Sequence, residues 1–174
     1  FDQAAVPALE LSVNDWNNVE TSWNFRDLPL LRSGDWEVKP GQQGGTWKGS
    51  TLAESWDNYA SYCNAAVQHM QELETENNSL WISAYGLNDE LVPDAPEDQI
   101  TLANADKKKD IIAFLSYAVG CMMGRYSLDK SGLILANQGD TLENYLAKVE
   151  KPLEDLQFSP DKDAIVPVLD GEWF

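Results

Sequence analysis

The chain of 174 residues is strongly acidic and rich in aromatic side chains. It carries 29 Asp and Glu against 12 Lys and Arg, which gives a formal net charge of −17 at pH 7. Phosphate binding needs Lys and Arg to displace condensed counterions, so this balance argues against an extended nucleic-acid groove. Because 43% of the residues are hydrophobic and 10% are aromatic, the acidity does not indicate disorder. This length supports one core, and we expect a single domain over residues 1–174.

The sequence offers little support for a membrane or secreted protein. The longest apolar run, Ile111–Met123, is too short to span a bilayer. The first residues form no signal peptide, so we expect a cytoplasmic protein with no membrane partner. Cys63 and Cys121 lie among apolar neighbours, which is typical of reduced, buried thiols. Because the chain begins with Phe1 rather than Met, we expect it to be a fragment of a larger protein.

The first 49 residues carry short helix and turn signals. Ser12 is a candidate N-cap for a short helix whose apolar residues recur at intervals of three and four as far as Trp23. Residues 34–49 hold five of the 11 glycines. This stretch predicts a flexible Gly-rich loop, or a short hairpin around Trp36–Lys39 and Thr46–Lys48.

The strongest pattern predicts one very long helix over about residues 50–85. Thr51 and Glu54 have the spacing of a capping box, and apolar residues then recur at alternating intervals of three and four. Gly86 follows as a residue that ends the helix in the left-handed conformation. The period also permits coiled-coil pairing. Because the stripe is rich in Ala, Tyr and Trp, we favour packing within the domain.

A second helix is predicted over about residues 107–123. Its inward face is expected to carry the apolar residues at helical spacing, namely Ile111, Leu115, Ala118, Val119 and Met122. Gly124 follows as the end of the helix, and Gly120 inside it would let another backbone approach closely.

A third helix is predicted over about residues 141–151, capped by Asp140 or Thr141. The apolar run Ala164–Leu169 contains Pro167 and is at best an edge strand. The predicted fold class is therefore mainly α, with few or no strands.

The residues alone predict no catalytic centre. His69, the single histidine, lies in the middle of the long helix and is expected to be structural, because a hydrolase base needs a nucleophile beside it. Two distant cysteines and one histidine do not have the spacing of a zinc site. Asp27, Glu37 and Lys39 resemble the spacing of metal-dependent nucleases, in which carboxylates hold Mg²⁺. Since this triplet is common by chance, a Mg-dependent nuclease is a remote alternative.

Several stretches together resemble a known family. They are ETSWNF at 20–25 with LPLL at 28–31, LETENN at 73–78 running into AYGLNDEL at 84–91, SYAVGCMMGRYSLDK at 116–130 and IVPVLDGEWF at 165–174. Together they resemble the C-terminal part of the PglX family, the large adenine-specific DNA methyltransferases of BREX phage-defence systems, which are related to the fused restriction–modification methylases. The resemblance covers most of the chain except residues 34–49, and its most specific stretch is 116–130.

The resemblance implies a parent enzyme that uses S-adenosylmethionine to methylate adenine N6 and flips the base out of the stack. The family does this with an Asn-Pro-Pro-Tyr motif and binds the cofactor at a Gly-containing loop. Neither occurs here, so no catalytic, cofactor-binding or metal residue is carried over. We expect a non-catalytic helical scaffold associated with target recognition. The implied partners are the rest of the parent, DNA through the parent, and other BREX proteins.

Six residues are candidate DNA contacts: Arg125, Tyr126, Lys130, Lys107, Lys108 and Lys109. Arg125 and Lys130 flank a predicted helix end, where they could read a guanine or bind a phosphate. The alternative is that Arg125 pairs with a carboxylate or caps helix carbonyls, and the net charge favours this alternative. The lysine run opens a helix, where positive charge opposes the helix dipole, so a phosphate contact competes with a simple solvated face.

A further interpretation comes from a different class of protein. The acidic surface is also typical of a protein-interaction or DNA-mimic module that binds basic partners. Carboxylates clustered at phosphate-like spacing would support it, whereas an even spread would not.

Overall fold

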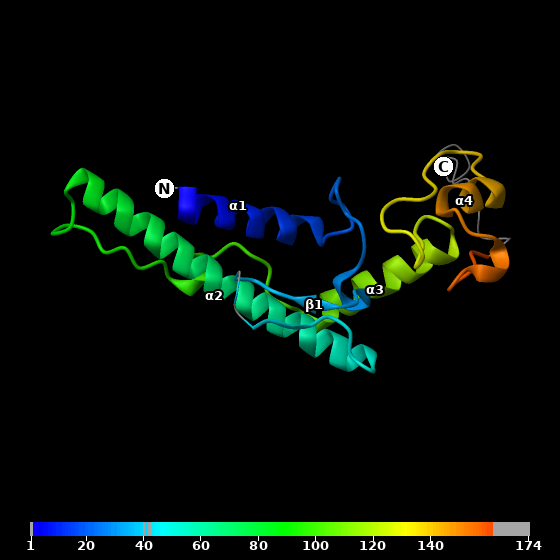
Figure 1. The fold of residues 1–174 in the computed structure, drawn as a ribbon, viewed down its shortest axis with the longest axis horizontal. Helices are drawn as coiled ribbons and strands as arrows, with labels where there is room; N and C mark the ends of the chain where they lie inside the picture. Colours follow the sequence, from blue (N-terminus) through cyan, green and yellow to red (C-terminus); the bar gives the residue numbers. More distant parts are fainter. Residues whose placement is uncertain (1, 40, 42, 162–174) are drawn as a thin grey trace. The chain divides into compact units, whose positions relative to one another are not determined.

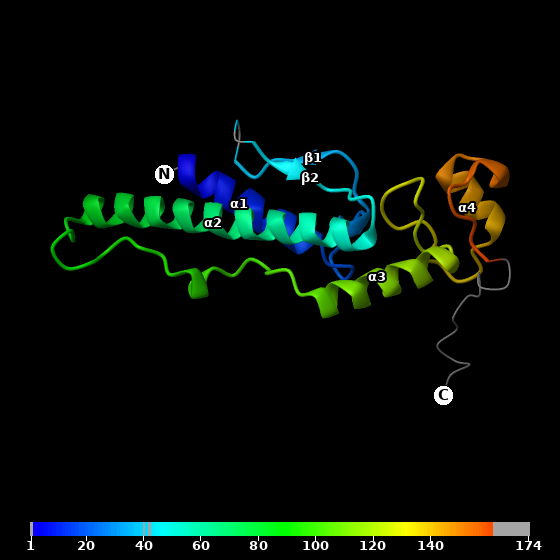
Figure 2. The same cartoon turned by 90° about the horizontal axis from the view of Figure 1, so that it is seen from below.

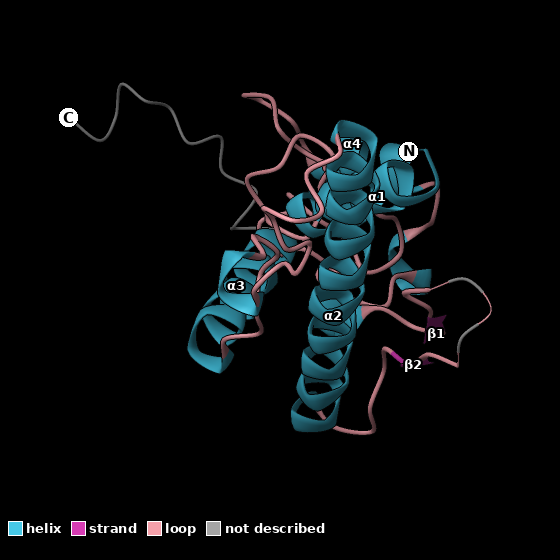
Figure 3. Cartoon of the chain, turned by 90° about the vertical axis from the view of Figure 1, so that its left-hand side faces the viewer, coloured by secondary structure: helices cyan, strands magenta, loops and turns pink. Residues whose placement is uncertain are grey.

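The computed structural model describes residues 2–39, 41 and 43–161, and it is mainly helical. Among these residues the helices are α1 (Asp2–Asn17), α2 (Leu52–Tyr85), α3 (Lys107–Met122) and α4 (Leu142–Val149). The strands are β1 (Asp35–Trp36) and β2 (Gly45–Thr46) (Figure 3). The mainly α prediction and its three helices are confirmed. The predicted edge strand at Ala164–Leu169 lies outside the described residues.

The chain divides into two compact units, and each unit combines two separate stretches of sequence. Unit 1 comprises Phe1–Val19 and Pro29–Lys107, and unit 2 comprises Glu20–Leu28 and Lys108–Phe174, in each case as far as the residues are described. The prediction that residues 1–174 form a single domain stays a prediction.

Unit 1 is organised around the pairing of α1 with α2. The two helices lie side by side and run in opposite directions (Figure 1). Their apolar faces meet in a buried core made of Ala4, Leu11, Ala66, Val67, Met70 and Leu73, and Leu102 from the segment after α2 completes it. The α2 members recur at intervals of one, three and three, so the predicted stripe of the long helix is the side that packs against α1.

Both ends of α2 follow the predicted capping chemistry. The Thr51 hydroxyl oxygen accepts the Glu54 backbone N–H (3.2 Å), and the Glu54 carboxylate accepts the backbone N–H of Ser50 (2.7 Å). At the other end Gly86 has φ +70°. The next residue, Leu87, donates its N–H to the Ile82 carbonyl (2.9 Å), which satisfies a carbonyl that the helix leaves open.

Two further segments cover α2 within unit 1. The strands β1 and β2 pair antiparallel, which confirms the hairpin alternative for the Gly-rich stretch; its flexibility stays a prediction. The rings of Trp36 and Trp47 pack on Tyr62 of α2, with centroid distances of 5.7 and 4.7 Å.

After α2 the chain returns along this helix from residue 91 to 106 (Figure 2). This return segment also reaches α1, because the Asp15 carboxylate accepts the Ala103 N–H (3.2 Å).

The prediction for the first helix was wrong at both ends. The helix begins at Asp2, ten residues before the proposed cap, and ends at Asn17, so it never reaches Trp23, whose side chain is 100% exposed. Ser12 lies inside the helix, where its hydroxyl donates to the Ala8 carbonyl (3.0 Å). Pro7 is the sixth residue of the helix, beyond the first four N–H groups that have no intrahelical partner, so it removes one backbone hydrogen bond from the second turn.

Unit 2 has an aromatic core that joins its two stretches of sequence. Tyr117 of α3 stacks on Tyr126 at a centroid distance of 4.9 Å and an interplanar angle of 13°. Phe25 meets both rings edge to face, at 6.0 and 5.6 Å. A Cβ added at Gly120 would lie 2.6 Å from the Tyr126 ring. Gly120 therefore admits an aromatic side chain, and the prediction that it admits another backbone was wrong.

The predicted inward face of α3 was also wrong. Leu115 and Val119 are 57% and 51% exposed, and Met122 is exposed as well. The buried residues of the helix are Tyr117, Gly120 and Cys121. The aromatic core takes the side of α3 that carries the small residue, because only there can a ring come close to the helix axis.

A second core in unit 2 surrounds α4. It contains Ile134, Leu135, Tyr145 and Val149. The stretch before α4 is held to the end of α3, because Ile134 donates its N–H to the Arg125 carbonyl (2.8 Å) and Leu135 donates to Gly124 (3.2 Å). In the part of the chain that the structure describes, no helix has the length and apolarity to cross a membrane.

Candidate functional site

The candidate DNA contacts Arg125 and Tyr126 lie together at the end of α3. Gly124 has φ +73° and ends the helix as predicted, and the Arg125 N–H then donates to the Gly120 carbonyl (2.8 Å). This turn sends the Tyr126 ring back against α3, where its side chain is only 2% exposed. Tyr126 is therefore a core residue, and only its hydroxyl group is available for polar contacts.

A polar network surrounds that hydroxyl group. Arg125 places its guanidinium 5.6 Å from the Tyr126 ring centroid and donates from Nε to the Tyr126 hydroxyl (3.1 Å). The hydroxyl in turn donates to Oε1 of Glu20 (3.0 Å), and Ser116 donates to Oε2 of the same carboxylate (2.8 Å). Burial raises the pKa of Tyr126, so the hydroxyl remains a donor at neutral pH. The contacts reported for Arg125 are with the hydroxyl and ring of Tyr126, and they differ from the expected pairing with a carboxylate or with helix carbonyls. DNA binding by Arg125 stays a prediction.

Lys130 serves the end of α4 in this structure. Its Nζ donates to the Lys148 carbonyl (2.6 Å) and to the Glu150 carboxylate (2.8 Å). Glu150 itself has the left-handed φ of +62°, which is unfavourable for a residue with a side chain. The hydrogen bond from Lys130 holds the pKa of Glu150 below its usual value. Lys130 thus neutralises the carbonyl end of α4, and a DNA contact by this residue stays a prediction.

The three lysines at the start of α3 have different surroundings. Lys107 belongs to unit 1 and lies with its ammonium 5.2 Å from the ring centroid of Trp56. Lys108 and Lys109 belong to unit 2 and are exposed. A cation over an indole ring gives a reason for a positive charge at this helix start that needs no phosphate.

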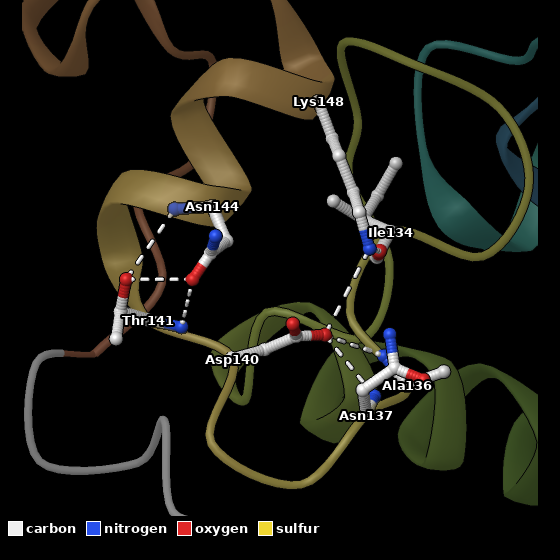
Figure 4. Close-up of polar contacts among 7 residues, drawn as sticks. All are labelled: Ile134, Ala136, Asn137, Asp140, Thr141, Asn144 and Lys148. Atoms are coloured by element: carbon white, nitrogen blue, oxygen red, sulfur yellow. Dashed lines mark hydrogen bonds and ion pairs between the residues drawn. The ribbon is translucent and has the colours of Figure 1, made fainter.

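In the stretch before α4, side chains hydrogen-bond to the backbone at the helix start and in the preceding turn (Figure 4). Thr141 is the N-cap, and its hydroxyl and the Asn144 side chain form a capping box with each other's backbone N–H groups. Asp140, the other candidate cap, instead accepts the N–H groups of Asn137 (3.1 Å) and Ala136 (3.2 Å). These bonds lower the pKa of Asp140. Lys148 of α4 donates from Nζ to the Ile134 carbonyl (2.7 Å), so it links the helix to this preceding stretch.

The residues of the nuclease alternative have other contacts. Lys39 pairs with Glu72 (3.0 Å), and Glu37 accepts the N–H of Gly41 (2.6 Å), all within unit 1. Asp27 belongs to unit 2. Among the described residues, no three His, Cys, Asp or Glu side chains are grouped so that they could hold a metal ion.

The cysteines and the histidine are buried. Cys63 and Cys121 are both buried thiols outside any disulfide, as predicted, and burial raises the pKa of the Cys121 thiol to about 11. Such a thiol is protonated at neutral pH and is a poor nucleophile. His69, which was expected at the surface or half-buried, is buried, and its Nδ1 lies 3.5 Å from Oε2 of Glu72.

Two curated proteins match the chain over nearly all of its length. An adenine-specific methyltransferase PglX of Lacticaseibacillus casei (strain Zhang) is 29% identical over 166 residues, which cover 95% of this chain and 12% of that protein. An adenine-specific methyltransferase BrxX of Escherichia coli O9:H4 (strain HS) is 30% identical over 192 residues, which cover 100% of this chain and 14% of that protein. The chain is therefore similar to a segment of PglX-type adenine-specific methyltransferases.

The PglX-like segment spans only a small part of these relatives, and no family model matches its sequence. The resemblance seen in its quoted stretches is thereby confirmed. Its last quoted stretch, IVPVLDGEWF, lies outside the described residues.

Nothing in the sequence marked Glu20 as a partner of Tyr126, because the two residues are 106 positions apart and only the fold brings them together.

Proposed function

We propose that this chain is a non-catalytic helical segment, from the C-terminal part, of a PglX-type DNA methyltransferase that modifies adenine N6 with S-adenosylmethionine in phage defence. The observation that carries the proposal is the match of 95% and 100% of the chain to a small part of each of two adenine-specific methyltransferases. The segment would support target recognition in the parent, in the cytoplasm, together with other proteins of the defence system.

The chemistry of the chain agrees with a supporting role. The 174 residues contain no Asn-Pro-Pro-Tyr motif with which the parent family holds the flipped adenine. Arg125 and Lys130 lie inside the most specific stretch, where Arg125 donates to the Tyr126 hydroxyl and Lys130 donates to Glu150 and to the carbonyl end of α4. A net charge of −17 also repels the DNA backbone, which supports placing the main DNA-binding surface in other parts of the parent.

A direct test measures methyl transfer and cofactor binding by the chain itself. The chain is incubated with tritiated S-adenosylmethionine and unmethylated host DNA, beside a full-length PglX-type methyltransferase as the positive control. We expect no methyl transfer and no heat of cofactor binding by titration calorimetry from the chain, while the control shows both. Methylation or micromolar cofactor binding by the chain would overturn the proposal.

The supporting role needs a second, positive test. A full-length PglX-type methyltransferase is compared with a version that lacks the part aligned to this chain. We expect the deletion to abolish methylation of the target sequence while cofactor binding is retained. Unchanged methylation would show that the segment is dispensable and would contradict the supporting role.

A further inference from the structure

Helix α1 of unit 1 carries a second apolar stripe on the side that faces away from α2. Four apolar residues at intervals of three, four and three share this side, namely Val6, Leu9, Val13 and Trp16. Each of these four residues, called the outer stripe below, is between 46% and 65% exposed. Ala4 and Leu11, on nearly the opposite side of the helix, are buried in the core with α2. The helix is therefore apolar on two sides, and only one of them is buried among the described residues.

The composition of the outer stripe indicates what kind of surface would cover it. A helix with apolar residues on two sides is typical of a helix that lies between two packed layers. The outer stripe contains no charged residue, and exposed polar residues such as Glu10 and Asn14 separate it from the buried side. The stripe is straight and about 15 Å long, which suits another helix packed along α1. The covering surface is therefore expected to be apolar and uncharged.

The size of the outer stripe distinguishes a separate partner from a tethered one. At these exposures its four side chains offer on the order of 300 Å² of apolar surface. A stable complex of separate proteins buries about 800 Å² on each partner, so a second copy of the chain would bind only weakly through this stripe. Interfaces between domains of one polypeptide begin at about 300 Å² on each side. They hold because the covalent link keeps the effective concentration in the mM range.

The two methyltransferase relatives contain ample polypeptide for such a contact. The chain aligns with 12% of one relative and 14% of the other, so most of each protein lies outside the aligned part. We propose that the outer stripe of α1 docks on an apolar surface elsewhere in the same methyltransferase polypeptide. The proposal rests on the proposed function and adds to it the surface through which this segment contacts the rest of the enzyme.

The test compares thiol labelling of the chain alone with labelling of the full-length methyltransferase that contains it. Leu9→Cys places a thiol in the outer stripe, and Asn14→Cys is the matched control, because residue 14 is exposed on the polar side of the same helix. Labelling by a maleimide is measured by mass spectrometry of the peptide that contains the new thiol, so other cysteines do not contribute. We expect residue 9 to react at least about tenfold more slowly in the full-length enzyme, and residue 14 to change by less than about twofold.

Three labelling results would overturn the proposal. Equal reactivity of residue 9 in the two proteins would mean that nothing in the full-length enzyme covers the outer stripe. Slow labelling of residue 9 in the dilute chain alone would mean that the chain covers its own stripe. Protection that develops in the chain alone as its concentration rises would identify a second copy as the occupant.

A charge substitution provides an independent measurement. Val13→Asp and Asn14→Asp each add one negative charge to α1, but only the first lies in the outer stripe. We expect Val13→Asp to lower the unfolding temperature of the full-length enzyme more than that of the chain alone, and Asn14→Asp to affect both proteins equally. An equal decrease in both proteins with Val13→Asp would overturn the docking. Methyl transfer by the unmodified full-length enzyme is measured in parallel, because its absence would overturn the proposed function, whereas the labelling result concerns the docking alone.

Discussion

Gly120→Ala tests the packing of the aromatic core in unit 2. The added Cβ would lie 2.6 Å from Cδ2 and 2.9 Å from Cε2 of Tyr126, so the ring must move by about 0.8 Å to restore an ordinary contact of 3.4 Å. The ring has little room for this movement, because Tyr117 stacks on it at 4.9 Å and Phe25 meets its edge at 5.6 Å.

The expected size follows from two opposing effects. Overpacking of a well-filled core costs about 1–3 kcal/mol. Replacing Gly by Ala inside a helix stabilises it by about 1 kcal/mol. The net result for Gly120→Ala is a loss of about 1 kcal/mol in the free energy of unfolding of unit 2, where the same change at an open helical position would give a gain.

Hydrogen exchange followed by NMR is the suitable assay, because it reports on unit 2 alone. The Ile134 N–H, which donates to Arg125 outside the helix, is the reporter, and its exchange should become about fivefold faster. Ala113→Gly, in the same helix, is the control that measures the local cost of glycine. Slower exchange in Gly120→Ala would refute the reasoning, since it would mean that no ring lies against this residue.

Three further predictions concern a turn, a cap and a buried carboxylate. Gly86→Ala, at φ +70° with open space around its Cβ, should cost about 1 kcal/mol in thermal unfolding, and Gly86→Asn should cost less. Thr141→Ala should destabilise α4 by about 1 kcal/mol, measured by exchange of its first-turn amides, and an unchanged rate would contradict the capping role. Burial raises the pKa of Asp129, but hydrogen bonds from Lys151 and Gln157 outweigh it and hold the pKa below 3.8. These bonds therefore stabilise unit 2 above about pH 4 and are lost as the pH falls through the folded-state pKa. The stability difference between the unmodified chain and Asp129→Asn should shrink in urea titrations between pH 6 and pH 3, and a constant difference would refute this linkage.

The sequence predicted best those elements whose signals are local. The long helix was found because Thr51, Glu54 and Gly86 satisfy backbone groups within a few residues of themselves. The choice between Asp140 and Thr141 could not be made in advance, because both can cap and only the packed structure gives Asp140 another task.

The errors share a physical cause. A stripe of apolar residues shows that a helix is amphipathic, but it does not say which face has a partner. In α3 the large residues Leu115 and Val119 point away from the core because a ring occupies the side of Gly120. In α1 the hydroxyl of Ser12 bonds within the helix, so the residue that usually signals a start lies in the interior instead.

Unit 2 can be completed only late in synthesis. Residues 20–28 supply Phe25 to the core of unit 2. The Arg26 carbonyl accepts the Gly132 N–H (2.6 Å), and the Glu20 carboxylate accepts the hydroxyl of Tyr126, which lies 106 positions later in the sequence. At ribosomal rates of about 5–20 residues per second, Phe25 waits about 5–20 s before its partners exist. A chain that begins at Lys108 would never acquire them. The two units therefore cannot be separated by a single cut, and residues 20–28 cannot take up their place in unit 2 until the ribosome has passed α3.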